Sequence, residues 1–326
     1  MLSLQDKLLE VTDLTTTFKL QSGSVVSPVD HASFFVRKGE VVGIVGESGC
    51  GKSMTATSII RLIPPPGRIT DGRVLFQGKD VVQMRSQELS ALRGAHISTI
   101  FQDPLTFLNP VYTIGRQIGE TVRLHLGVSK EEARKRTLEV LDMVKIPAPE
   151  RVAKSYPFEL SGGMRQRVLI AIAMCCNPEL IIADEPTTAL DVTVQAQILS
   201  LLTGLVREKN ISMILITHDM GIVADVCDRL YVMYAGQIVE SGTLDDIFYR
   251  PAHPYTKALL NSVLTIKERR EVIASIPGVV PDIEHFPKDC RFGPRCQERC
   301  ERCAGTEPGL EEVSPGHFAK CALYRR

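Results

Sequence analysis

The chain has 326 residues, and its 38 lysines and arginines balance 38 aspartates and glutamates, so the formal net charge is zero. Balanced charge excludes a global attraction to nucleic acid or anionic lipid, and any binding function must come from local sites. The length predicts a full hydrophobic core, as two domains or as one large domain with an appendage. The first thirty residues lack a signal-peptide pattern, and the longest apolar run, VLIAIAMCC, is about half a membrane span. We expect a cytosolic protein with reduced thiols, in which clustered cysteines favour metal binding over disulfides.

Short β-branched segments alternate with longer helical patterns along the chain. Two N-terminal segments, residues 8–20 and 30–40, alternate apolar and polar residues as antiparallel strands do. Residues 229–242 predict a hairpin that turns at Ala235-Gly236. Five other segments predict strands, several of them apolar throughout: VVGIVG (41–46), VLFQG (74–78), ISTIFQ (97–102), LIIAD (180–184) and MILITH (213–218). The order predicts an α/β fold, with a core on a largely parallel sheet and an antiparallel β subdomain.

Helical periodicity replaces the strand signal between residues 103 and 178, as in KEEARKRTLEVLDMVKI. We expect an inserted α-helical subdomain there. Proline and glycine punctuate YRPAHPY and SIPGVVPD, which places a domain boundary near Arg250. The predicted organisation is therefore a main domain of residues 1–250 and a small Cys-rich extension of residues 251–326.

The segment GESGCGKS follows the predicted strand VVGIV and opens an apolar helix, which is the context of a phosphate-binding P-loop. Its glycines let backbone N–H groups curl around phosphate oxygens, Lys52 reaches the β and γ phosphates, and Ser53 offers a hydroxyl to Mg²⁺. The alternative is a glycine-rich turn with a chance Gly-Lys-Ser. The residues assigned to the nucleotide here are Gly46, Glu47, Ser48, Gly49, Cys50, Gly51, Lys52, Ser53 and Met54.

Two further segments predict phosphate chemistry. In LIIADEP, Asp184 ends a buried strand and would hold Mg²⁺ through water, while Glu185 would orient and polarise the attacking water. A loop after a strand is the plain alternative. In LSGGMRQR, Ser161, Gly162 and Gly163 precede a helix and predict a second backbone N–H nest for phosphate, although Ser-Gly-Gly alone is a common helix start.

The order of these motifs resembles the ATP-binding cassette (ABC) transporter ATPases over roughly residues 8–250. The resemblance implies ATP and Mg²⁺ as cofactors, with Glu185, His218 and Gln102 as catalytic residues. It places Gln102 at the Mg²⁺ site, His218 near the γ-phosphate and Asp191 in the loop that crosses the dimer interface. It also implies that Phe18 stacks on adenine, although an aromatic residue in an early strand can equally be core packing.

Three segments, VVGIVGESGCGKSM, IFQDPLTFLNPVYTIGRQI and HPYTKALL, are similar to the dipeptide/oligopeptide importer branch of that family. The resemblance implies a heterodimer with a second ABC ATPase or a homodimer in isolation, two transmembrane permease subunits, and an extracytoplasmic peptide-binding protein. It implies a peripheral position on the cytoplasmic face of the cell membrane. Relatives import nickel or glutathione with nearly the same ATPase. A non-transport ABC ATPase is the alternative class, and it would usually add a second cassette, a long coiled-coil insertion or basic patches for nucleic acid.

The extension contains the cysteine-rich segment CRFGPRCQERCERC and one later cysteine. Only Cys300 and Cys303 have the two-residue spacing that zinc sites prefer, whereas a [4Fe–4S] cluster accepts thiolates from an irregular loop. Zinc is the second choice and a metal-free loop the third. The resemblance to the importer branch assigns the iron–sulfur ligands to Cys290, Cys296, Cys303 and Cys321, with Cys300 as a spare. The cluster would be structural, or alternatively a redox sensor of transport.

Overall fold

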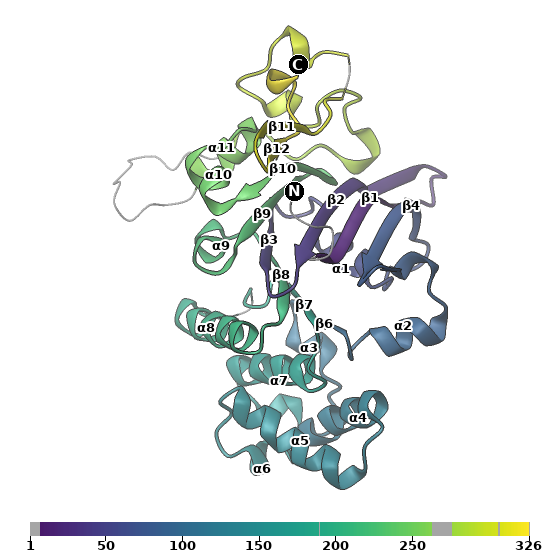
Figure 1. Cartoon of the computed structure of the whole chain (residues 1–326), viewed down its shortest axis with the longest axis vertical. Coiled ribbons are helices and arrows are strands. Elements are labelled where there is room, and N and C mark those ends of the chain that lie inside the picture. Colours follow the sequence, from purple (N-terminus) through teal and green to yellow (C-terminus); the bar gives the residue numbers. More distant parts are fainter. Residues whose placement is uncertain (1–6, 189, 263–275, 306, 326) are drawn as a thin grey trace. The chain divides into compact units, whose positions relative to one another are not determined.

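The computed structural model describes residues 7–188, 190–262, 276–305 and 307–325, and the chain forms two compact units (Figure 1). Unit 1 comprises residues 1–36, 41–82 and 215–326, and unit 2 comprises residues 37–40 and 83–214. Across the described ranges, none of the helices has the length and apolar character that a membrane span requires. The predicted boundary near Arg250 lies inside unit 1 and stays a prediction.

Unit 1 contains an antiparallel sheet in the order β2-β1-β4-β5. The predicted strand at VLFQG is present as the end of β4, where residues 74–76 pair antiparallel with β1 and do not join the parallel sheet. Only Val74 and Phe76 of this segment are buried, which is the alternation of a strand with one covered face. The bounds in this sheet are Lys7–Lys19 for β1, Val25–Arg37 for β2, Arg68–Phe76 for β4 and Lys79–Asp80 for β5.

The second sheet of unit 1 carries its strands in the order β11-β12-β10-β9-β3. β3 runs parallel to β9, and β9 and β10 form the predicted hairpin, with Ala235 and Gly236 at positive φ as a two-residue turn requires. The strands are β3 (Val41–Val45), β9 (Arg229–Tyr234), β10 (Gln237–Thr243), β11 (Glu311–Ser314) and β12 (His317–Ala319). The helices are α1 (Lys52–Ile59), α9 (Met220–Val226), α10 (Leu244–Tyr249) and α11 (Pro254–Asn261).

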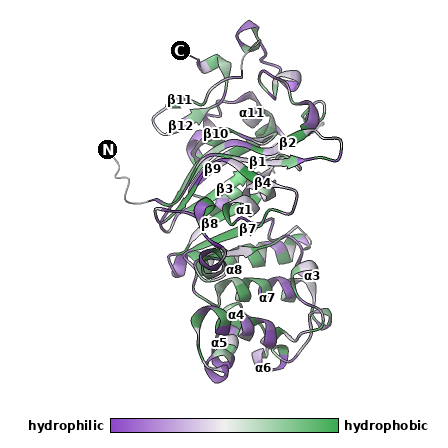
Figure 2. Ribbon diagram, turned by 90° about the vertical axis from the view of Figure 1, so that its right-hand side faces the viewer, coloured by the Kyte–Doolittle hydropathy of each residue, from purple (hydrophilic) through white to green (hydrophobic). Residues whose placement is uncertain are grey.

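Unit 2 contains the predicted helical segment and the parallel strand pair β6 and β7. Strand β7 reads LIIAD and is buried along its whole length, and Figure 2 draws it in the green of hydrophobic residues. Strand β8 (Ser212–Thr217) crosses the boundary between the units and is also fully buried. The other elements of unit 2 are α2 (Ser86–Leu92), β6 (Ile97–Ile100), α3 (Pro104–Phe107), α4 (Ile114–Leu126), α5 (Lys130–Met143), α6 (Pro149–Val152), α7 (Gly162–Met174), β7 (Leu180–Asp184) and α8 (Val192–Glu208). Both the helical expectation for residues 103–178 and the α/β fold class are confirmed.

The C-terminal segment (residues 251–326) belongs to unit 1, and backbone pairing and buried polar contacts connect it to the rest of that unit. β12 pairs antiparallel with β10, so Glu240 lies opposite Ala319. The Glu240 carboxylate is fully buried and accepts hydrogen bonds from the backbone N–H groups of Ala252 (2.7 Å) and His253 (2.9 Å). Its Oε1 also lies 2.7 Å from His317 Nε2. One carboxylate therefore connects two parts of the segment, residues 252–253 and His317, to β10.

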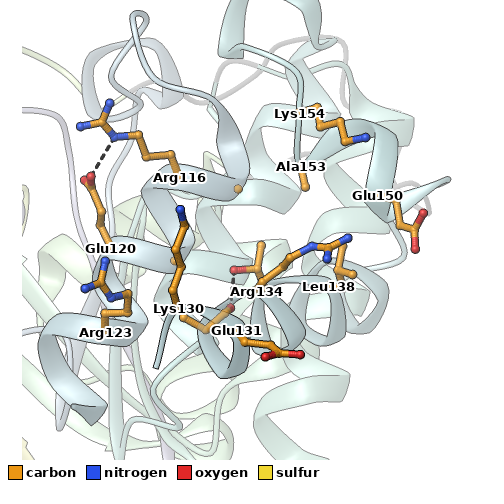
Figure 3. Close-up of a pocket in the computed structure, with 14 residues that line it drawn as sticks. Arg116, Glu120, Arg123, Lys130, Glu131, Arg134, Leu138, Glu150, Ala153 and Lys154 are labelled. Carbon is orange, nitrogen blue, oxygen red and sulfur yellow. Dashed lines mark hydrogen bonds and ion pairs between the residues drawn. The ribbon is translucent and has the colours of Figure 1, made fainter. Parts of the chain in front are cut away.

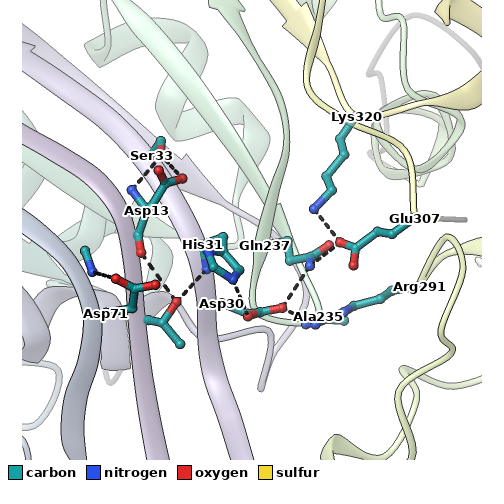
Figure 4. A network of polar contacts seen from close by, with 12 residues as sticks. Asp13, Asp30, His31, Ser33, Asp71, Ala235, Gln237, Arg291, Glu307 and Lys320 are labelled. Carbon is teal, nitrogen blue, oxygen red and sulfur yellow. Dashed lines mark hydrogen bonds and ion pairs between the residues drawn. The ribbon is translucent and has the colours of Figure 1, made fainter.

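A second polar network connects the same segment to β2 and to the hairpin of β9 and β10 (Figure 4). Arg291 donates to the Asp30 carboxylate and to the Ala235 carbonyl, and Gln237 donates to both Asp30 and Glu307. Because the extension has few apolar residues, these polar contacts and the added strand supply much of its fixed geometry.

Candidate functional site

The P-loop connects β3 to α1 in unit 1, as predicted. Gly46, Gly49 and Gly51 all have positive φ. A Cβ on Gly46 would lie 2.1 Å from the Met233 carbonyl oxygen, and one on Gly51 would lie 2.2 Å from the Pro28 carbonyl oxygen, so both positions require glycine. Among the described residues, no neighbouring atom lies within 4 Å of a Cβ built on Gly49, so this part of the loop leaves room for a ligand.

Lys52 begins α1 and its side chain turns back into the loop. It is 4% exposed, and its Nζ donates to the carbonyl oxygens of Gly46 (2.8 Å) and Glu47 (2.9 Å). Ser53 is exposed beside it, and burial raises the pKa of the Cys50 thiol. A buried ammonium, an exposed hydroxyl and an open glycine loop at a helix N-terminus fit the phosphates and Mg²⁺ of a nucleotide.

Unit 1 also contains two other predicted nucleotide residues. Phe18 is half-buried on β1, and its ring lies 2.4 Å from the point where a Cβ of Gly67 would stand. His218 is exposed and directly follows β8. The next residue, Asp219, begins α9 by accepting a hydrogen bond from the Gly221 N–H at 2.8 Å. Phe18 therefore packs on a glycine, while His218 is an exposed residue at the end of a buried strand.

Unit 2 brings together the predicted acids and Gln102. Asp184 is the last residue of β7 and is 7% exposed, and Glu185 follows it in the left-handed region at φ 44°. The Glu185 Oε2 accepts hydrogen bonds from Gln102 Nε2 at 3.1 Å and from Thr188 Oγ1 at 2.8 Å. The sequence did not indicate a role for Thr188, since a threonine in a loop carries no pattern of its own. The carboxylate is thus held at the strand end by two donors.

The Ser-Gly-Gly segment and Asp191 are neighbours in unit 2. Ser161 caps α7, and Asp191 caps α8 by accepting from the Val194 N–H at 3.0 Å. A Cβ on Gly163 would lie 2.8 Å from a Val194 methyl group, so the helix starts pack closely. The first turns of the two helices therefore lie side by side.

The four cysteines assigned to a cluster line one cavity of ≈ 10 Å³ in unit 1, together with His253. Burial raises the pKa of Cys290 and of Cys296, and it raises the pKa of Cys321 to about 11. The spare cysteine, Cys300, is exposed, and its Sγ lies 3.7 Å from that of Cys303. In the ranges that the structure describes, no three His, Cys, Asp or Glu side chains are grouped as a metal site. The cysteines share a cavity without forming a ligand set.

A separate hollow lies in unit 2 (Figure 3). It has a volume of ≈ 820 Å³, and charged side chains of α4, α5 and α6 line it, with Arg116 paired to Glu120 at 2.8 Å. None of the residues predicted to bind nucleotide or metal contributes to it. Cavity size alone therefore does not locate the phosphate chemistry.

Known protein families and curated relatives match most of the chain. Residues 29–188 match the family described as ABC transporter, and residues 239–303 match the oligopeptide/dipeptide transporter, C-terminal region. The dipeptide transport ATP-binding protein DppD of Bacillus subtilis (strain 168) is 49% identical over 98% of this chain and 95% of its own length. The oligopeptide transport ATP-binding protein OppD of Escherichia coli (strain K12) is 48% identical over 97% of this chain and 93% of its own.

A solved structure supports the same relationship. It is a dimeric ATP-binding cassette in a post-hydrolysis state with ADP and Pi, with a TM-score of 0.65 and 31% identity. The match covers 72% of this chain and 98% of the solved one. ATPases of this kind act together with permease subunits. The chain belongs to the ATP-hydrolysing subunits of ABC transporters, in the oligopeptide/dipeptide branch of that family.

Proposed function

We propose that the chain powers the import of dipeptides or oligopeptides across the cell membrane, from a peripheral position on its cytoplasmic face. The observation that carries this proposal is the C-terminal region specific to the oligopeptide/dipeptide branch, on a chain that also contains the complete phosphate motifs. The partners are a second ABC ATPase, two permease subunits and an extracytoplasmic peptide-binding protein.

Uptake into proteoliposomes that contain the assembled transporter tests the substrate. ATP inside the vesicles and the binding protein outside should drive accumulation of a labelled dipeptide or oligopeptide. Accumulation of nickel or of glutathione, with no peptide uptake, would replace peptide by one of these cargoes and leave the ATPase role intact. ATP hydrolysis without uptake of any of the three would contradict the import proposal.

We assign the roles of the site residues from the resemblance to the family. Lys52 neutralises phosphate charge, and Ser53, Gln102 and Asp184 are the residues that would hold Mg²⁺, directly or through water. Mg²⁺, when bound, supplies positive charge where negative charge develops. Glu185, fixed at the end of β7 by Gln102, orients the attacking water and polarises it.

The Ser161-Gly162-Gly163 nest and Asp191 serve the partner ATPase in this proposal. The nest closes on the γ-phosphate held by the partner's P-loop, and Asp191 lies in the loop that crosses the interface. The dimeric relative with ADP and Pi supports an arrangement of this kind. His218 contacts the γ-phosphate, and Phe18 stacks on the adenine. Hydrolysis removes the shared ligand and opens the pair.

We propose that the permease docks on the segment after Gln102. Leu105 and Val111 are large apolar residues that are 58% and 70% exposed in this segment. Substitution of Val111 by arginine is expected to reduce co-purification of the chain with the permease at least about tenfold, because a charge replaces an apolar contact at the interface. Val25→Arg, at a 63% exposed valine in unit 1, is the matched control. Equal assembly of both variants with the permease would contradict this docking site.

The cysteine cavity is proposed to hold a [4Fe–4S] cluster with a structural role. Support comes from the four cysteines that line one cavity, since four thiolates are the ligand set of such a cluster. Anaerobically purified protein should contain about four iron and four sulfide per chain, with absorbance near ~400 nm. Cys303→Ser should lose the colour, and Cys300→Ser, in the same Cys-x₂-Cys pair, should keep it. One zinc and no colour would replace the cluster by a zinc site, and no metal would contradict both.

A further inference from the structure

The C-terminal segment holds both the backbone and the side chain of a P-loop residue, Glu47. The Glu47 N–H donates to the Tyr255 hydroxyl at 2.9 Å. The Glu47 carboxylate accepts from Arg295 Nη1 at 2.7 Å and from Arg295 Nη2 at 3.0 Å. The Arg295 side chain is 4% exposed and that of Glu47 is 27% exposed. A two-point pair that is largely withdrawn from water fixes the direction of the carboxylate as well as its position.

Arg295 has a fixed direction that does not depend on Glu47. Its Nε donates to the Pro277 carbonyl at 2.9 Å, and its Nη1 also lies 3.3 Å from the Tyr234 hydroxyl. The guanidinium carbon lies 5.8 Å from the centre of the Tyr234 ring and 6.0 Å from that of Phe292. Because backbone and rings already set the guanidinium, it is Glu47 that must align to Arg295.

Glu47 in turn sets the part of the loop that aims the ammonium of Lys52. The Glu47 carbonyl oxygen accepts from Lys52 Nζ at 2.9 Å and from the Cys50 N–H at 3.3 Å. Because the Glu47 N–H is bonded to the Tyr255 hydroxyl, this backbone group is turned to the C-terminal segment. Any displacement of Glu47 therefore moves the carbonyl groups that orient Lys52.

We propose that Arg295 is a positioning residue for the nucleotide site: acting through Glu47, it holds the P-loop in the conformation that receives the phosphates of ATP. The inference rests on the binding of ATP by this P-loop. It makes nucleotide affinity depend on a segment 248 residues away in sequence, next to Cys296 of the cysteine cavity. Tyr255 contributes the second anchor, on the backbone of the same residue.

ATP binding and steady-state hydrolysis by full-length variants test the proposal. Arg295→Ala is expected to raise the Kd and KM for ATP about three- to tenfold and to change kcat by less than about twofold, because binding geometry is lost and the reacting groups remain. Arg295→Lys should recover part of the affinity, since it keeps the charge without the planar fork. Arg299→Ala is the matched control from the same segment, where Arg299 pairs with Asp289 at 2.8 Å, and it should leave KM unchanged.

A double-mutant comparison separates the path through Glu47 from a general loss of structure. In a Glu47→Ala background, Arg295→Ala should cause no further change in KM, because the connection is already cut. An unchanged KM in Arg295→Ala, or an equal loss with and without the Glu47 carboxylate, would overturn the proposal. If Arg295→Ala does not fold, Arg295→Lys and Glu47→Gln replace it in the test, because they keep the side-chain sizes. Each of them should then raise the KM for ATP above that of the wild type. Wild-type protein that binds ATP no better than Lys52→Ala would refute the nucleotide site itself.

Discussion

Replacement of Glu185 by glutamine is expected to lower ATP hydrolysis at least about 100-fold while leaving ATP binding intact. The amide keeps the size of the side chain and one oxygen for the hydrogen bonds from Gln102 and Thr188, but it no longer polarises water as a carboxylate does. ATP that is bound and not hydrolysed should accumulate any dimer that the chain can form. Phosphate release and size-exclusion chromatography with ATP measure the two effects.

The matched control for this variant lies at the other end of the same strand. Glu179 directly precedes β7, and its Oε1 lies 3.0 Å from His96 Nδ1, so Glu179→Gln makes the same chemical change beside the same strand. Its hydrolysis rate should stay within about twofold of wild type. Normal hydrolysis by Glu185→Gln would remove this carboxylate from the mechanism. A trapped variant that stays monomeric with ATP would show that the second, different ATPase is required.

Replacement of Glu240 by alanine is expected to destabilise the protein by about 3–5 kcal/mol. The change removes the acceptor of two backbone N–H groups and the partner of His317 at a fully buried position. Buried donors without partners cost the full desolvation free energy, and the alanine also leaves a cavity. The free energy of unfolding from chemical denaturation, followed by circular dichroism, measures the effect.

Glu307→Ala is the control for that stability measurement. Glu307 also belongs to the C-terminal segment and accepts from Gln237 and Lys320, but its side chain is 37% exposed. Its loss should cost about 0–1 kcal/mol, because water replaces the partners of an exposed ion pair. Equal losses from the two variants would mean that burial of Glu240 does not set its contribution.

The sequence was sufficient for the fold class and for the local elements around the phosphate chemistry. The strand before the P-loop, the helix after it and the apolar strand that ends in Asp184 each carry a signal within a few residues. For VLFQG the sequence predicted a strand but not its sheet, because a short run of β-branched and aromatic residues occurs in both parallel and antiparallel sheets. The pairing of β4 with β1 depends on alternation over the longer segment of residues 68–76.

Contacts between distant segments could not be predicted. The pair of Arg295 with Glu47 joins residues 248 positions apart, and periodicity reports only on neighbours along one element. The sequence did not indicate that the arginines of the cysteine-rich segment have different partners. In the structure, Arg291 pairs with Asp30 and Arg295 pairs with Glu47 of the P-loop. The proximity of Gln102 to Glu185 was indicated only by the resemblance to a family. In the structure, a hydrogen bond joins the two side chains.

The pairing of β12 with β10 also changes which strand forms this edge of the sheet. Without the C-terminal segment, β10 would be an edge strand with a row of unpaired backbone N–H and C=O groups. An exposed edge strand of this kind can pair with a strand of a second chain. The outermost strand is instead β11, which has only four residues and carries Glu311 and Glu312. A short strand with two negative charges is a poor template for further pairing. The C-terminal segment therefore also protects this chain against self-association through its sheet.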